Sequence, residues 1–74
     1  MKIKYVIIDG MSAVLLPDTL QHSDMDRVGK ITGAGFCAFY EVDGEWVVDV
    51  FGKSVSCDIE SKWEDINIIK LLLG

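Results

Sequence analysis

The chain has 74 residues, the length of one small domain, so its core is expected to be thin. Half of the residues are hydrophobic and 26% are charged, which is a globular composition and excludes a disordered chain. Twelve acidic residues against seven Lys and Arg give a net charge of −5, which disfavours nucleic acid and anionic membranes as partners. No apolar run approaches the roughly 20 residues that span a bilayer, and Asp9 interrupts the first one, so we expect a cytoplasmic protein without a signal peptide.

The N-terminal segment predicts a β-hairpin around the dipeptide Asp9-Gly10. Residues 2–8 and 12–16, which flank it, are rich in β-branched and other apolar side chains. Asp-Gly tolerates the two positive φ angles that a type I′ turn requires. A two-residue turn would place Ile8 opposite Met11, in a ribbon that is apolar on both faces.

Residues 18–28 predict a short helix or helical turn. Asp18 and Ser23 are alternative N-caps, and Asp26 follows Ser23 at the spacing of a weakened capping box. Gly29 is expected to end this segment, because glycine readily terminates a helix.

A three-stranded antiparallel meander is expected over residues 36–42, 45–51 and 54–59. The dipeptides Asp43-Gly44 and Gly52-Lys53 supply its turns, because both suit two-residue hairpin loops. With these turns, the alternation of side chains produces one apolar face and one mixed face. The apolar face, expected to be the core, consists of Cys37, Phe39, Trp46, Val48, Val50, Val55, Cys57 and Ile59. The mixed face consists of Phe36, Ala38, Tyr40, Val42, Glu45, Val47, Asp49, Phe51, Ser54, Ser56 and Asp58.

Cys37 and Cys57 fall on the two outer strands of this meander. Their Cα atoms would lie roughly 9–10 Å apart, which is two strand spacings, whereas a disulfide needs them within about 7 Å. The chain also lacks a Cys-x-x-Cys pair, so we expect two free thiols and no zinc site.

The C-terminal residues 63–73 predict a helix that packs on the core face of the meander. Ser61 and Glu64 have the spacing of a capping box just before it. The helix is apolar over more than one stripe, so its surplus leucines need a second cover, either the first hairpin or another subunit. The elements together predict a single α+β domain over residues 1–74: an N-terminal β-hairpin, a short helical segment, the antiparallel meander and the C-terminal helix.

Groups that could perform catalysis or bind a metal are sparse. His22, Asp24 and Asp26 alternate like the start of a calcium loop, but the glycine and the final glutamate of such a loop are missing. Asp49 and Asp58 would form a carboxylate pair on an open sheet face, where no loops build a pocket around them. We therefore expect a protein that is not an enzyme and that carries no cofactor and no metal.

The mixed sheet face has more aromatic surface than one C-terminal helix can cover. Contiguous exposed aromatic side chains mark interfaces, and carboxylates beside them favour a basic partner. We therefore expect a non-enzymatic protein-binding module that acts sterically, and further expect a homodimer. The alternative for this face is internal cover by the first hairpin or by the middle segment. The expected partner-binding residues are Phe36, Tyr40, Val47, Phe51, Glu45, Asp49 and Asp58.

A small-ligand site is the alternative function. Gly33 and Gly35 could bring backbone N–H groups close to an anion, and Arg27 or Lys30 could neutralise it. Such a site would let a small oligomer bind or sequester a phosphate-containing ligand, such as a signalling nucleotide, at a subunit interface. Thermal stabilisation by nucleotides would favour this alternative over protein binding.

Three strings stand out in the C-terminal half: Gly33-Ala34-Gly35-Phe36, Phe51-Gly52-Lys53-Ser54-Val55-Ser56 and Glu60-Ser61-x-x-Glu64-Asp65. Together they resemble the small accessory proteins that bacteriophages and prophages encode, and they include no catalytic signature. The resemblance implies a compact acidic protein that acts by binding in the host cytoplasm. Its action would be to inhibit host or antiviral machinery or to sequester a signalling nucleotide.

Overall fold

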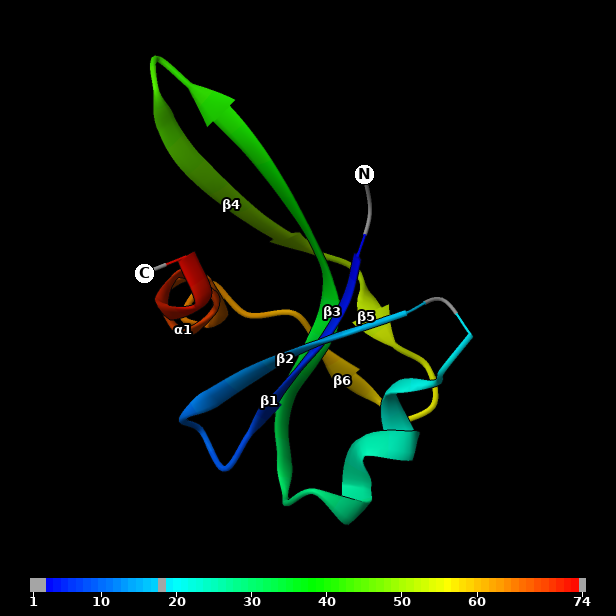
Figure 1. Cartoon of the computed structure of the whole chain (residues 1–74). Helices are drawn as coiled ribbons and strands as arrows, with labels where there is room; N and C mark the ends of the chain where they lie inside the picture. The colour runs from blue at the N-terminus through cyan, green and yellow to red at the C-terminus, as the bar shows by residue number, and fades with distance from the viewer. Residues whose placement is uncertain (1–2, 18, 74) are drawn as a thin grey trace.

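The computed structural model describes residues 3–17 and 19–73. It is mostly antiparallel sheet with a small C-terminal helix, in agreement with the α+β class at that level of detail. The main sheet has four strands in the order β2-β1-β3-β4, and a separate two-stranded ribbon, β5-β6, lies against it beside β3 (Figure 1). The four strands are β1 (Ile3–Ile8), β2 (Ser12–Leu16), β3 (Ile31–Val42) and β4 (Glu45–Phe51).

The first hairpin forms where the sequence predicts it, but its register differs by one residue. Asp9 and Gly10 have φ angles of 52° and 68°, and the Met11 N–H donates to the carbonyl of Ile8 at 3.0 Å. Ile8 nevertheless pairs with Ser12, so Met11 joins the loop, and the expected pairing of Ile8 with Met11 is wrong. The observed register places Val14 opposite Val6, where both contribute to one hydrophobic cluster, and leaves Met11 exposed.

Strand β1 is the centre of the core, because it lies between β2 and β3 and is covered on both faces. Tyr5 and Ile7 belong to one buried cluster, and Val6 and Ile8 belong to a second one. Side chains alternate along a strand, so these two clusters lie on opposite sides of the sheet. This explains why residues 5–8 carry large, mainly apolar side chains, since all four are buried, whereas Ile3 and Lys4 at the start of the strand are only half-buried.

The hairpin of β3 and β4 has the register that the sequence predicts. Phe39 pairs with Val48, and Val42 pairs with Glu45 across the two-residue turn. Asp43 and Gly44 have φ angles of 52° and 84°, as a type I′ turn requires. Turn chemistry and side-chain alternation therefore suffice to place every residue of this hairpin on its correct face.

The third strand of the expected meander does not form. Gly52 has a φ of 71°, but the chain after it leaves β4 instead of returning along it. Only β5 (Lys53–Ser54) and β6 (Ile59–Glu60) are extended, and they pair with each other. The Ser54 hydroxyl accepts the Cys57 N–H at 3.1 Å, and Asp58 has a φ of 55°, so residues 55–58 close a tight turn.

This change of course puts Cys57 and Ile59 against Val6 and Ala34, on the sheet face opposite the one expected. Cys37 belongs to the other cluster. Both cysteines are free thiols, but they are separated by the sheet itself and not by two strand spacings on one face. Burial raises the pKa of the Cys37 thiol to about 11.

The helical segments are shorter than the sequence predicts. The middle segment is a 3-10 helix, η1 (His22–Arg27), and the C-terminal one is α1 (Asp65–Lys70) followed by the 3-10 turn η2 (Leu71–Leu73). Asp18, one of the expected N-caps, lies outside the described residues. None of the described helices is long and apolar enough to cross a membrane.

The expected serine caps are replaced by aspartates that accept a backbone N–H three residues back. Asp24 accepts the Gln21 N–H at 2.8 Å, and Asp65 accepts the Lys62 N–H at 3.1 Å. An acidic residue at this position matches the second half of a capping box. The expected capping roles of Ser23 and Ser61 are therefore wrong.

The body has three layers. Helix α1 covers one face of the sheet through Ile69, which packs in a cluster with Tyr5 and Val48. Segment η1 and the β5-β6 ribbon cover the other face, where Met25 and Ile59 join the second cluster. Figure 1 shows these covers gathered over the lower part of the sheet, while β3 and β4 continue beyond them.

Candidate functional site

The outer part of the β3–β4 hairpin projects from the body as a two-stranded arm (Figure 1). The pairing of β1 with β3 reaches Cys37, and from residue 38 onward β3 pairs with β4 alone among the described strands. We call residues 38–49 the distal hairpin; Phe39 and Val48 at its base still pack with the core cluster under α1, and its outer part lies free of the body. Its projection is consistent with the elongated shape of the molecule, whose principal extents are 37 × 22 × 18 Å.

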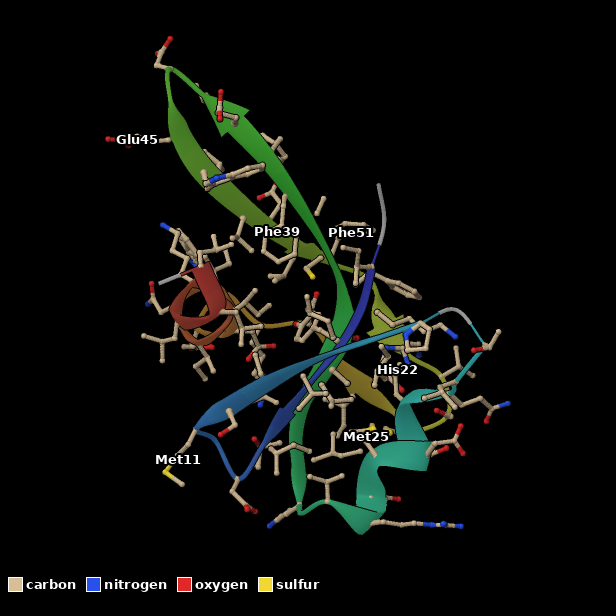
Figure 2. The ribbon with its side chains drawn as sticks, in the orientation of Figure 1. Met11, His22, Met25, Phe39, Glu45 and Phe51 are labelled. Carbon is tan, nitrogen blue, oxygen red and sulfur yellow. The ribbon has the colours of Figure 1, made fainter. Side chains whose placement is uncertain are left out.

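All of the charge on the distal hairpin is negative. Its carboxylates are Glu41, Asp43, Glu45 and Asp49, and all four side chains are exposed. Residues 31–52 contain no Lys, Arg or His. Figure 2 shows Glu45 near the tip, pointing away from the hairpin, whereas Phe39 and Phe51 lie where the hairpin meets the body. The arm therefore presents a negative field that no neighbouring cation on these strands neutralises.

Apolar side chains lie open beside these carboxylates. Tyr40 is 41% exposed, Val42 is 48% exposed and Trp46 is 55% exposed. Trp46 was expected in the core; it does lie on the sheet face that α1 covers, but its side chain remains largely in water. The strand reaches further than the short helix, and this difference leaves Trp46 exposed.

A hydrogen bond ties together two of the expected binding residues, Tyr40 and Asp49. The Tyr40 hydroxyl donates to Oδ2 of Asp49 at 2.6 Å across the two strands. This bond raises the pKa of Tyr40, because the neutral phenol is needed as the donor to a carboxylate. The aromatic ring and the carboxylate are thus held side by side on the face that also carries Val47.

Two aromatic residues of the expected binding face, Phe36 and Phe51, differ in exposure. Phe36 and Phe51 stack with ring centroids 6.1 Å apart, and His22 of η1 meets Phe36 edge-on at 5.6 Å. Phe36 is therefore partly covered by the middle segment, as the internal-cover alternative requires, while Phe51 remains 41% exposed. A Cβ on Gly52 would come within 3.0 Å of the Phe36 ring, so the glycine also makes room for this pair.

Asp58 does not join the other expected binding residues. It lies in the turn at residues 55–58, because the strand that would have placed it beside β4 does not form. The sheet face that Asp49 shares with Tyr40 therefore has no second carboxylate from that segment. The expected pair of Asp49 and Asp58 is wrong.

The residues of the alternative phosphate site are placed differently from expectation. Gly33 and Gly35 are buried within β3, where they pair with Ile7 and Tyr5 of β1 rather than lining an open loop. Close packing explains both glycines, since added Cβ atoms would lie 2.9 Å from Oδ1 of Asp65 and 3.0 Å from the Phe51 carbonyl oxygen, respectively. The side chains of Arg27 and Lys30 are exposed, and the Lys30 N–H donates to Oδ1 of Asp9 at 3.1 Å.

A groove that the sequence does not reveal lies beside Phe36. It encloses about 500 Å³ and has Lys4, His22, Lys53 and Ser56 in its lining. The His22 Nε2 atom donates to the carbonyl of Gly35 at 2.8 Å, and Lys4 Nζ donates to the carbonyl of Leu20 at 2.8 Å. Phe36 and Val55 make most of the lining surface apolar, and its charged members are the two lysines, with no Asp or Glu among the lining residues.

The residues described here form no group of three or more His, Cys, Asp or Glu side chains that could hold a metal ion. Two members of the calcium-like alternation have other roles. His22 is buried and bonded to Gly35, and Asp24 caps η1. No protein-family model, curated protein or solved structure matches the chain at a significant level.

Proposed function

We propose that this chain is a non-enzymatic protein-binding module that docks through its distal hairpin on a basic partner. The observation that carries the proposal is the arm itself. It projects from the packed body, bears four exposed carboxylates without a cation, and exposes Tyr40, Val42 and Trp46 among them.

The two kinds of side chain contribute differently to binding. Carboxylates steer a basic partner to the arm and oppose acidic competitors, an effect that weakens as salt is added. Aromatic side chains supply affinity, because buried Trp and Tyr residues account for most of the binding free energy at many interfaces. A partner surface with both cations and apolar side chains therefore fits the arm best.

The mechanism follows from the shape. An arm that engages a partner brings the body against the neighbouring surface, where it excludes other ligands by its bulk. An accessory or inhibitor protein of the phage type, acting on a host protein in the host cytoplasm, would work in this way. The phage origin and the cytoplasmic location stay predictions.

The interface of the expected homodimer would use a different surface from the distal hairpin. Two distal hairpins brought together would place two sets of four carboxylates side by side, and like charges repel. The exposed apolar residues Trp63, Leu71 and Leu72 flank α1 and offer self-association a surface outside the distal hairpin itself. Size exclusion with light scattering, on wild type and on Leu72→Lys, measures whether this surface joins two copies.

A peptide array tests the proposed function directly. Labelled protein is applied to immobilised peptides of varied charge, and we expect the bound sequences to be basic and apolar. The variant Glu45→Gln with Asp49→Asn should lose this binding, whereas Asp26→Asn with Glu64→Gln removes the same charge from exposed side chains outside the arm and should keep it. Bound peptides without a basic bias, or equal losses in both variants, would overturn the proposal.

The groove beside Phe36 favours a second candidate function, the binding of a phosphate-containing small ligand. Its two lysines suit an anion better than the buried glycines of β3 do. A thermal-shift measurement with nucleotides and inorganic phosphate tests this candidate. A rise in melting temperature that Lys53→Gln removes would support it, and no rise with any of these ligands would exclude it.

A further inference from the structure

Strand β4 is an edge of the main sheet. In the order β2-β1-β3-β4, no described strand pairs with its outer side. An edge strand leaves a row of backbone N–H and C=O groups unpaired, and such a row is a template for another strand. Helix α1 contacts β4 but packs on the face of the sheet, through Ile69 and the cluster around Val48.

The register identifies the unpaired groups. A two-residue turn makes Val42 and Glu45 a hydrogen-bonded pair, and along an antiparallel ladder such pairs alternate with non-bonded ones. The N–H and C=O groups of Trp46, Val48 and Val50 therefore point outward. The next outward carbonyl, that of Gly52, is taken by the Ser61 N–H at 3.0 Å, as this alternation requires.

The two edges of the sheet differ in their protection. Strand β2 has five residues and is followed by Pro17, which cannot donate to a neighbouring strand. Strand β4 has seven residues, with no Pro, no Lys and no bulge against β3. Natural proteins use such devices to block edges, so β4 is the edge left available.

Charge decides which strand this edge accepts. A second copy would bring its own β4 with Glu45 and Asp49, and in several registers these carboxylates would lie near each other. A strand with Lys or Arg in the same places would neutralise them. The edge therefore discriminates against self-pairing and favours a basic segment.

We propose that the outer edge of β4 receives an extended peptide segment with alternating apolar and basic side chains, which adds as an antiparallel fifth strand. The inference rests on the proposed function and names the form of its partner. Peptide residues opposite Trp46, Val48 and Val50 share the α1 face of the sheet and are apolar. Their neighbours share the face of Glu45 and Asp49 and are basic. Addition of a strand to a sheet edge is an established mode of peptide recognition.

The probe is the peptide acetyl-Lys-Val-Lys-Val-Lys-Val-Lys-amide, with its Glu-for-Lys counterpart as control. In the proposed geometry each valine N–H donates to β4, whereas each lysine N–H points away. N-methylation of the valines should weaken binding at least roughly tenfold, and N-methylation of the lysines should leave it nearly unchanged. Fluorescence anisotropy of the labelled peptides measures both.

Two measurements on the protein side locate the peptide. Hydrogen exchange followed by NMR should show the amides of Trp46, Val48 and Val50 protected when the lysine peptide is added, and not when the glutamate peptide is added. Trp46→Pro removes one outward N–H and should weaken binding beyond the matched Trp46→Ala, which keeps that N–H. Circular dichroism checks that both variants fold. If Trp46→Pro does not fold, the hydrogen-exchange measurement on the wild-type protein tests strand addition instead.

The outcomes separate this inference from the proposed function. Binding that depends on Glu45 and Asp49 but is insensitive to N-methylation and leaves the three amides unprotected would overturn strand addition and retain the acidic docking arm. Failure of this probe and of every basic peptide in the array would overturn both. Protection of the three amides that rises with protein concentration in the absence of peptide would assign the edge to a second copy, and would also overturn the inference.

Discussion

The hydroxyl of Tyr5 donates a 2.6 Å hydrogen bond to Oδ2 of Asp65, and both side chains are buried. The bond joins the central strand β1 to the first residue of α1. The same carboxylate accepts the backbone N–H of Lys62, so a single buried group both fixes the turn that leads into the helix and anchors the helix to the sheet. Because α1 is only six residues long, we infer that its position depends on this carboxylate as well as on Ile69.

Tyr5→Phe is expected to destabilise the fold by about 1–3 kcal/mol, because it removes one of the two hydrogen bonds that the buried Oδ2 atom of Asp65 accepts and leaves only the Lys62 N–H as its donor. Urea unfolding measures the loss. The matched control is Tyr40→Phe, which removes an equally short bond from Tyr40 to Asp49 at the exposed surface. That variant should change stability by no more than about 0.5 kcal/mol. Equal effects of the two substitutions would contradict the anchoring role of Asp65.

The same bond predicts how stability changes at high pH. Burial, followed by the hydrogen bond to Asp65, raises the pKa of Tyr5 above its usual value. The folded state therefore keeps a proton that the unfolded state releases near pH 10, at about the usual tyrosine pKa. Stability should be fully present below this pH and decrease as the pH rises above it. Tyr5→Phe should make that decrease shallower in unfolding curves recorded from pH 9 to 11, and the remaining decrease is expected from Cys37, whose pKa burial also raises. A decrease of unchanged slope would assign it wholly to groups other than Tyr5.

The two thiols should differ in reactivity. Burial raises the pKa of Cys37 to about 11, and its side chain has no access to solvent, whereas Cys57 is partly exposed. Iodoacetamide attacks the thiolate, so at pH 8 Cys57 should be alkylated first and Cys37 only after denaturation. Mass spectrometry of the digested protein reads the two sites separately. Alkylation of both at equal rates in the native protein would contradict the burial of Cys37.

Gly33 should tolerate no side chain. A Cβ there would lie 2.9 Å from Oδ1 of Asp65 and 3.0 Å from Ile7, so Gly33→Ala must displace the carboxylate that holds α1. We expect a loss of about 1–3 kcal/mol, measured by thermal unfolding. Wild-type stability in this variant would show that the helix can shift without cost.

Phe51→Asp tests whether the exposed aromatic contributes to binding rather than to the core. Phe51 stacks on Phe36 but remains largely open, so the variant should fold with a loss of about 0.5–1.5 kcal/mol from the aromatic pair. Binding to basic peptides should become weaker. The new carboxylate attracts a basic peptide, but it does not replace the apolar surface that the Phe51 ring would bury against the partner. Val55→Asp, at a side chain that is 85% exposed in the turn between β5 and β6, is the control. Loss of the circular dichroism signal in Phe51→Asp would place this ring in the core.

Local rules predicted one hairpin fully and another nearly so. Asp43-Gly44 fixes the register of β3 and β4, because a two-residue turn leaves no freedom in the pairing. Asp9-Gly10 makes the same turn, yet Met11 enters the loop, and the register that results buries Val14 beside Val6. That register depends on packing against residues far along the chain, and the identity of the turn residues alone does not predict such packing.

The third strand of the expected meander, residues 54–59, was predicted wrongly for the same reason: its course depends on packing against distant residues. Gly52 bends the chain as predicted, but the bend directs β5 and β6 across the sheet face, where Cys57 and Ile59 fill the second cluster. The position of Asp58 depends on that course, so the prediction that places it beside Asp49 is wrong as well. Tyr40 and Asp49 lie within one hairpin, so alternation alone placed them together.

Strand β3 runs without a break for twelve residues, from Ile31 in the packed body to Val42 at the tip of the arm. The arm is therefore a rigid extension of the core and not a tether on a hinge. Force or twist applied by a partner at the tip passes along one ladder to the residues beside β1. A load at the tip is therefore borne by the same strand that pairs with β1 in the core.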